Sequence, residues 1–136
     1  MLETGTGPGF QTALPARLAA RVISIERWPD LAGQARRNLA RHGPGNAQVP
    51  AGDGSRGRPE GAPYDAILVS AAFPQVPAPL AAQLRIGGRL LPPSGPGGSE
   101  QVMPFERSPS GPQRRHLLTL ARFVRLHGRH GFPPRS

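Results

Sequence analysis

The sequence contains no cysteine and no lysine, and its aromatic residues are few. Without cysteine, the chain can form no disulfide, thiolate metal site or cysteine nucleophile. One tyrosine and one tryptophan leave few aromatic side chains on which unpaired bases could stack. No apolar run is long enough to span a bilayer, and no charged-then-apolar leader precedes the first glycines. We therefore expect a cytoplasmic protein with no membrane partner.

The basic charge has an explanation other than nucleic-acid binding. All 17 basic residues are arginine, and with eight acidic residues they give a formal net charge of +9, which favours binding to polyanions such as nucleic acids. The chain also holds 18 glycines and 18 prolines, and this joint excess is typical of a GC-rich coding sequence whatever its function. The arginines are scattered over different predicted elements. We expect weak nonspecific attraction to polyanions and no specific nucleic-acid partner.

The first dozen residues predict a short strand, a tight glycine turn and a helix. Gly5, Gly7 and Gly9 stand at alternate positions, which is not the spacing of a dinucleotide site. Glycine permits a positive φ and the close approach of a ligand, and the first N–H groups of a helix can face that ligand. Glu3 precedes the turn, and Glu26 ends the next apolar run, where α/β folds hold a ribose. A glycine turn alone is often only a loop, but the combination favours a nucleotide-like ligand.

The rest of the chain alternates between strand and helix patterns, which indicates an α/β fold. Pro15 predicts a kink or a break in the first helix, which is expected over residues 9–20. Pro50 confines the third strand to a sheet edge. The strands expected after the first helix are residues 21–26, 47–51, 64–70 in the sheet centre, and 85–91; one helix begins at residues 28–30 and ends at residues 42–45, and another spans residues 76–84. The chain is expected to finish with an antiparallel strand pair, residues 101–105 and 117–124, joined by the polar residues 107–115.

Residues 3–13 (Glu-Thr-Gly-Thr-Gly-Pro-Gly-Phe-Gln-Thr-Ala) resemble the cofactor motif of S-adenosylmethionine-dependent methyltransferases, and most closely that of protein-L-isoaspartate O-methyltransferases. Four further blocks follow in that family's order, at residues 22–27, 52–54, 62–72 and 84–90. The resemblance implies a Rossmann-like class I methyltransferase sheet, mostly parallel with an antiparallel C-terminal strand pair, over residues 1–126. Residues 127–136, rich in Gly, Pro and Arg, are expected to be a disordered tail.

The resemblance also implies roles for individual residues. With S-adenosylmethionine as the cofactor, Glu3 would face its methionine amino group, Glu26 its ribose and Asp53 its adenine. An ordinary Asp-Gly turn explains residues 52–54 nearly as well. Ala71, Ala72 and Ser94 would lie near the substrate. The implied cofactor-binding residues are Glu3, Gly5, Thr6, Gly7, Gly9, Gln11, Thr12, Glu26, Arg27, Gly52, Asp53 and Gly54.

The activity implied is methyl transfer to isoaspartyl carboxylates in damaged proteins, which would be the partners. A carboxylate acceptor is already ionised at neutral pH, so no strong general base is required. The family carries a segment before the glycine motif, with a catalytic serine in a Thr-Ile-Ser-Gln-Pro-like stretch. No such stretch occurs in this sequence, which resembles the family without its N-terminal segment, so we assign no catalytic residue. The alternative is an inactive remnant that at most binds the cofactor. No metal site is expected, because His127 and His130 lack partners at metal-ligand spacing.

Overall fold

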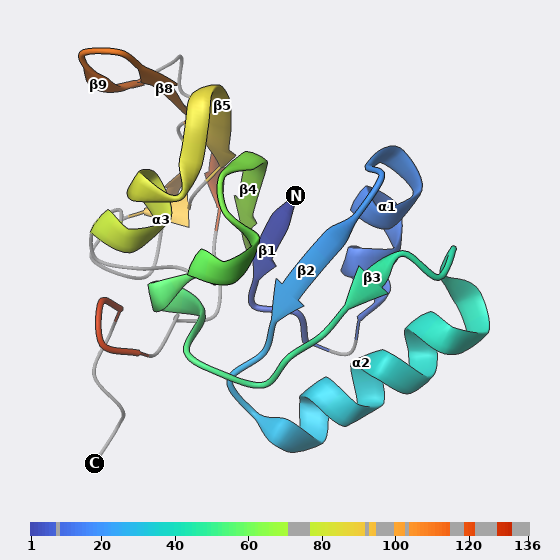
Figure 1. The fold of residues 1–136 in the computed structure, drawn as a ribbon. Coiled ribbons are helices and arrows are strands. Elements are labelled where there is room, and N and C mark those ends of the chain that lie inside the picture. The colour runs from blue at the N-terminus through green and yellow to red at the C-terminus, as the bar shows by residue number, and fades with distance from the viewer. Residues whose placement is uncertain are drawn as a thin grey trace.

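The computed structural model of the chain describes residues 1–7, 9–70, 77–91, 93–94, 100–102, 104–114, 119–121 and 128–131. A seven-stranded sheet with strand order β3-β2-β1-β4-β5-β8-β9 forms its centre (Figure 1). The strands are β1 (Leu2–Thr4), β2 (Val22–Ile25), β3 (Ala47–Gln48), β4 (Tyr64–Val69), β5 (Leu84–Leu91), β6 (Pro93–Ser94), β7 (Glu100–Val102), β8 (Phe105–Ser108), β9 (Gly111–Arg114) and β10 (Thr119–Ala121). The helices are α1 (Phe10–Leu18), α2 (Pro29–His42) and α3 (Ala78–Ala82), with the 3-10 turns η1 (Gly54–Arg56) and η2 (Pro59–Gly61).

The sheet has the predicted mixture of strand directions. The strands β3, β2, β1, β4 and β5 run parallel to one another, whereas β8 runs antiparallel to β5 and β9 antiparallel to β8. The third strand lies at a sheet edge, as Pro50 predicted. The Rossmann-like class I methyltransferase fold class is therefore confirmed.

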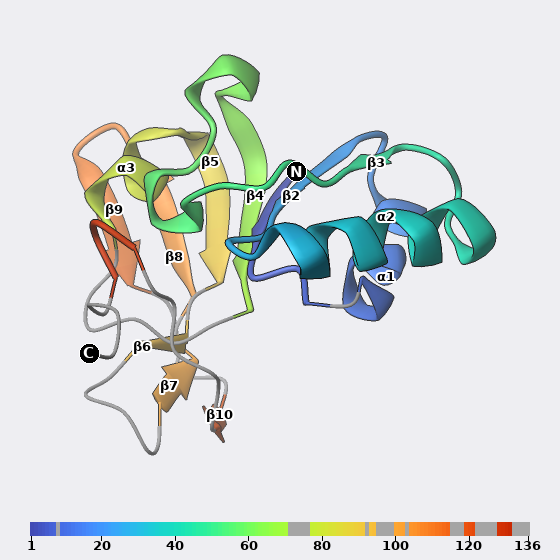
Figure 2. The ribbon, with the colours of Figure 1, turned by 90° about the horizontal axis from the view of Figure 1, so that it is seen from below.

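Helices cover both faces of the sheet. α1 and α2 lie on one face, and α3 with η1 and η2 lies on the other (Figures 1 and 2). The helix α2 contributes its buried residues Ala32, Ala35 and Leu39 to a small core with Val49. The larger core lies under α3 and consists of Leu2, Ile23, Ile25, Tyr64, Ile67, Val69, Leu80, Leu84 and Leu90. No helix among the described residues is both long enough and apolar enough to cross a bilayer.

Of the two outcomes predicted at Pro15, the break is not observed, because α1 runs without interruption from Phe10 to Leu18, and the kink stays a prediction. Proline removes one N–H donor from the helix. Its carbonyl still accepts a hydrogen bond from the Ala19 N–H at 2.9 Å, and Pro15 itself is buried. Packing of the ring therefore offsets part of the lost hydrogen bond.

The C-terminal third differs from the sequence prediction in two respects. The expected pairing occurs between β7 and β10, but in a separate three-stranded sheet with β6. The prediction that residues 107–115 only join these strands is wrong, because β8 and β9 form a hairpin that extends the main sheet. The sequence of this stretch is polar and lacks the alternation of apolar and polar residues that predicts a strand. Arg107 attaches the hairpin by donating to the carbonyl oxygens of Ala82 at 3.0 Å and Leu84 at 2.5 Å.

Candidate functional site

The turn between β1 and α1 requires its glycines. Gly5, Gly7 and Gly9 have φ values of 86°, 58° and 93°, a region that L side chains rarely occupy. A Cβ on Gly9 would lie 3.0 Å from the Ala35 backbone, so this glycine lets α1 pack against α2. A Cβ on Gly7 would have no heavy atom within 4 Å. The turn is thus packed against α2 at Gly9, whereas the space beside Gly7 is free of other described protein atoms within 4 Å.

The acid that ends the second strand lies at the mouth of this turn. Glu26 forms a parallel bridge with Ala51 and is only 5% exposed. Its Oε2 accepts a hydrogen bond from the Gly7 N–H at 2.8 Å, and its Oε1 accepts one from the Trp28 N–H at 3.3 Å. A carboxylate has about four acceptor positions, so two remain for the hydroxyls of a ligand.

The other acid of the motif, Glu3, is fully buried beneath the turn. Its carboxylate accepts hydrogen bonds from the hydroxyls of Ser24 at 2.6 Å, Ser70 at 3.5 Å and Thr12. The Thr6 hydroxyl in turn lies 2.6 Å from the Ser24 hydroxyl. Burial raises the pKa of Glu3, and the three hydroxyl donors lower it only in part. The carboxylate thus contacts protein hydroxyls, and its implied contact with a methionine amino group stays a prediction.

The loop after β3 brings a third acid to the same edge of the sheet. The Gly52 N–H donates to the Glu26 carbonyl oxygen at 2.8 Å, which places Asp53 next to the end of β2. Asp53 caps η1, because its Oδ1 accepts from the Ser55 N–H at 3.0 Å and the Ser55 hydroxyl at 2.6 Å. Burial raises the pKa of Asp53, but hydrogen bonds from the Arg129 and Ser55 N–H groups and the Ser55 hydroxyl, with the charge of Arg27, hold it below its ordinary value.

A cavity of about 640 Å³ opens beside Asp53. It lies between the loop after β3, the η1 and η2 turns, and the end of α3. The charged and polar side chains that line it are Asp53, Arg56, Arg58, Glu60, Gln83, Arg129 and His130. Among the described residues that line the cavity, Asp53 and Gly52 belong to the predicted site, whereas none belongs to the glycine turn.

The remaining predicted site residues divide into two groups. Arg27 lies at the edge of the site with its guanidinium 5.7 Å from the centre of the Trp28 ring, and Gly54 is buried at the start of η1. The backbone of Ser94 lies in β6, outside the main sheet. Ala71, Ala72 and the side chains of Gln11 and Ser94 lie outside the described residues. Their predicted roles stay predictions.

Three contributors were missed from the sequence. Ser24 is the polar residue inside the apolar run of β2, which was the available signal for its bond to Glu3. Ser55 gave no signal beyond following the Asp-Gly pair. Residues 128–131 fall within the segment predicted as a tail, yet they form a turn whose Arg129 N–H donates to Asp53 Oδ2 at 2.9 Å. Among the residues that the structure describes, no group of three or more acidic or histidine side chains could hold a metal ion.

The family model and the curated relatives point to one family. The family model described as Protein-L-isoaspartate(D-aspartate) O-methyltransferase (PCMT) matches residues 1–131. A curated protein-L-isoaspartate O-methyltransferase of Methanoculleus marisnigri is 57% identical over 71% of this chain and 44% of its own length. Another, from Anaeromyxobacter dehalogenans, is 51% identical over 93% of this chain and 61% of its own length. The chain thus spans about half the length of these relatives.

Solved structures show the same likeness. A protein-L-isoaspartate O-methyltransferase superposes with a TM-score of 0.86 at 30% identity, over 96% of this chain and 42% of that chain. A putative protein-L-isoaspartate O-methyltransferase of Plasmodium falciparum, in complex with S-adenosyl-L-homocysteine, superposes with a TM-score of 0.77 over 93% of this chain and 64% of that chain. At 22% identity, this second likeness shows the fold alone. The match to residues 1–131 shows the family: the chain belongs to the protein-L-isoaspartate O-methyltransferases.

Proposed function

We propose that the chain binds S-adenosylmethionine at the glycine turn and that the protein transfers its methyl group to isoaspartyl carboxylates. One observation carries the cofactor half of this proposal. The Gly7 N–H donates to the Glu26 carboxylate at 2.8 Å, within a turn whose three glycines all have positive φ. This contact joins an open backbone turn to an acid at the tip of the neighbouring strand, the arrangement that suits a nucleoside.

The residues present fit the cofactor. Glu26 is held by two backbone N–H groups and keeps acceptor positions for both ribose hydroxyls. The space beside Gly7 allows the cofactor to approach the backbone closely, because no described side chain fills it. Asp53, ionised at neutral pH, accepts a hydrogen bond from the amino group of adenine in this proposal. Glu3, buried beneath the turn, is the proposed partner of the methionine amino group of the cofactor.

The bound cofactor would supply a methyl group on a positively charged sulfur. Transfer forms a bond between a carboxylate oxygen of the acceptor and the methyl carbon, while the bond from that carbon to sulfur breaks. The products are a methyl ester and the neutral thioether, S-adenosylhomocysteine. The contribution of the protein is to hold the two reactants in line and to exclude water. Ala71, Ala72 and Ser94 are the proposed neighbours of the acceptor, and the names of the relatives support the choice of isoaspartyl groups.

The cofactor half is tested by calorimetric binding of S-adenosylhomocysteine to the full chain. The variant Glu26→Gln keeps the shape of the side chain but removes its charge and one acceptor oxygen. Losing the charge of the side chain and one of the two ribose hydrogen bonds weakens binding about 100-fold. The matched control is Asp65→Asn, an acid at the opposite end of the strands, which leaves the dissociation constant unchanged. Equal binding by Glu26→Gln and the parent would reject the proposed ribose contact.

The transfer half is tested by counting radioactive methyl groups moved to an isoaspartyl peptide, with the matching aspartyl peptide as control. The proposal expects incorporation into the isoaspartyl peptide alone. Binding of S-adenosylhomocysteine without any methyl transfer would reduce the function of this chain to cofactor binding, which is the inactive alternative. Failure to bind S-adenosylhomocysteine at all would reject both halves.

A further inference from the structure

The Asp53 carboxylate is held by two segments that lie far apart in the sequence. Its Oδ1 accepts hydrogen bonds from the N–H and the hydroxyl of Ser55, two residues further along the chain. Its Oδ2 accepts one from the N–H of Arg129, 76 residues away, at 2.9 Å. The Ser55 hydroxyl itself accepts a hydrogen bond from the N–H of His130 at 3.1 Å. Residues 128–131 therefore contact both the acid and the residue that orients it.

These residues form a compact turn that approaches Asp53 closely. The Gly131 N–H donates to the Gly128 carbonyl oxygen at 3.2 Å, which closes the turn. A Cβ added to Gly128 would lie 2.0 Å from Asp53 Oδ1 and 2.7 Å from the Ser55 hydroxyl oxygen. No side chain fits into so short a distance without displacing the carboxylate. Glycine is needed here for the close approach of the turn to the side chains of Asp53 and Ser55, and not for a positive φ.

The loop that carries Asp53 has other attachments that do not involve this turn. Gln83, in the turn after α3, donates through Nε2 to the Arg56 carbonyl oxygen at 2.9 Å and accepts from the Arg58 N–H at 2.8 Å. The backbone of the loop is thus fixed from the side of α3. The N–H groups of Arg129 and His130 instead donate to side-chain atoms of Asp53 and Ser55. They set the direction of the carboxylate more than the course of the loop.

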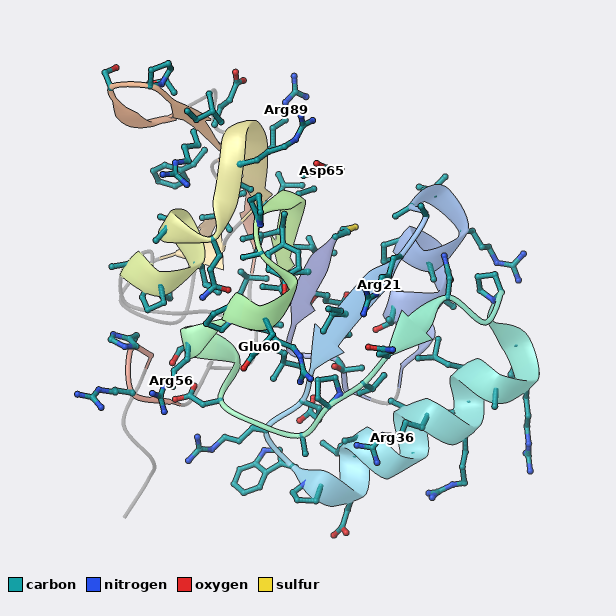
Figure 3. All side chains as sticks on the ribbon, viewed as in Figure 1. Arg21, Arg36, Arg56, Glu60, Asp65 and Arg89 are labelled. Carbon is teal, nitrogen blue, oxygen red and sulfur yellow. The ribbon has the colours of Figure 1, made fainter. Side chains whose placement is uncertain are left out.

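The turn also forms a wall of the cavity beside Asp53. Arg129 and His130 line this space together with Gly52 and Gln83. In Figure 3, Arg56 lies on the η1 segment next to the turn. A ligand that contacts Asp53 from this cavity would meet the turn as well.

We infer that the turn at residues 128–131 is a positioning element of the adenine site. The N–H groups of Arg129 and His130 hold Asp53 and Ser55 so that the carboxylate presents its remaining acceptor position to the 6-amino group of adenine. This inference rests on the proposed function, in which Asp53 accepts a hydrogen bond from that amino group. It adds Gly128 as the residue that makes the contact possible.

The test compares two ligands in the full chain by calorimetry. One is S-adenosylhomocysteine, and the other is S-inosylhomocysteine, which carries an oxygen in place of the 6-amino group. The parent chain binds the adenosyl ligand about ten-fold more tightly, because the inosyl ligand cannot donate to Asp53. Gly128→Ala displaces the carboxylate, raises the dissociation constant of the adenosyl ligand about ten-fold and brings the ratio of the two constants close to one.

The matched control is Gly45→Ala in the connection from α2 to β3. Gly45 has a φ of 87°, so alanine is strained there, but its Cβ would meet no atom within 4 Å. The control therefore lowers stability without changing the ratio, which separates a general loss of stability from a positioning effect. A Gly128→Ala chain that keeps the parent ratio would overturn the inference.

Two further variants keep the outcome decisive. Should Gly128→Ala fail to fold, Ser55→Ala removes the hydroxyl between His130 and Asp53 without adding atoms, and is expected to lower the ratio about three-fold. An unchanged ratio in Ser55→Ala would then overturn the inference. Asp53→Asn tests the proposed function separately: if this variant keeps the parent ratio, Asp53 is not the adenine acceptor and the failure lies in the proposed function.

Discussion

Acidic residues at the two ends of the parallel strands differ in their exposure and in their hydrogen-bond partners. At the carboxyl end, Glu3 and Glu26 are at most 5% exposed and accept hydrogen bonds from hydroxyls and backbone N–H groups. At the amino end, Asp65 forms an ion pair with Arg85 at 2.7 Å, with side chains 78% and 55% exposed. Figure 3 shows Asp65 and Arg89 together at this end, away from Arg56. The acids at the carboxyl end are thus held by neutral donors, whereas the acid at the amino end is paired with a cation.

The difference predicts where an acidic side chain matters for stability, and the largest effect is expected at Glu3. Glu3→Ala leaves the buried hydroxyls of Ser24 and Thr12 without their acceptor and opens a cavity at the sheet centre. Each unsatisfied buried hydroxyl costs about 1–3 kcal/mol, so we expect a loss of about 3 kcal/mol in the free energy of unfolding. Urea denaturation at neutral pH measures this loss. A loss below about 1 kcal/mol would show that the network under the turn is not a stabilising element.

A somewhat smaller effect is expected at the glycine turn itself. Gly9→Ala combines a φ of 93° with a Cβ only 3.0 Å from Ala35, and we expect a loss of about 2 kcal/mol. The matched control is Gly33→Ala inside α2, where a Cβ would meet the Arg37 guanidinium at an ordinary 3.5 Å. Alanine favours the helix there, so the control gains about 0.5–1 kcal/mol. Melting temperatures that move in the same direction for both variants would contradict this prediction.

The two acids with shifted pKa values give opposite dependences of stability on pH. The pKa of Glu3 lies above its ordinary value of 4.5, so the folded chain binds more protons and stability falls as pH rises from 4.5 through the folded pKa. The pKa of Asp53 lies below its ordinary value of 3.8. Its contribution is therefore complete above pH 3.8 and is lost as pH falls through the folded pKa.

Each limb of this profile has its own control variant. Glu3→Gln removes the fall above pH 4.5, and Asp53→Asn removes the loss below pH 3.8, whatever each substitution does to stability at a single pH. Urea midpoints measured between about pH 3 and pH 7 distinguish the two limbs. If Glu3→Gln leaves the upper limb unchanged, another group titrates there and the assignment to Glu3 is wrong.

The glycine turn and its two glutamates could be predicted because the interactions that place them are local or follow from the fold class. Three glycines at alternate positions specify the turn, and a parallel sheet brings the ends of β1 and β2 to one edge. The contact between Gly7 and Glu26 joins residues only 19 positions apart. Ser24 could also have been identified, since a polar residue inside a buried strand needs a partner.

The contacts around Asp53 could not be predicted in the same way. The turn at residues 128–131 lies about 76 positions away, and its donors are backbone N–H groups that every non-proline residue carries. No side-chain pattern marks Gly128 as the residue that approaches Asp53. The hairpin of β8 and β9 was missed for a related reason, because the polar stretch 107–115 lacks the alternation that marks a strand. Long-range backbone contacts of this kind need the folded chain.

The smallest effect is expected where the amino-end acid meets its arginine. Arg85→Ala removes an exposed ion pair whose side chains each lose rotamer freedom to form it, so we expect a change of less than about 0.5 kcal/mol. Asp65→Ala should give a similar value, and the double variant should show little coupling. Both differences should shrink further in high salt, because the charges are screened. A loss comparable to that of Glu3→Ala would mean that exposure does not separate the two ends of the sheet, and the contrast between them would then need another physical basis.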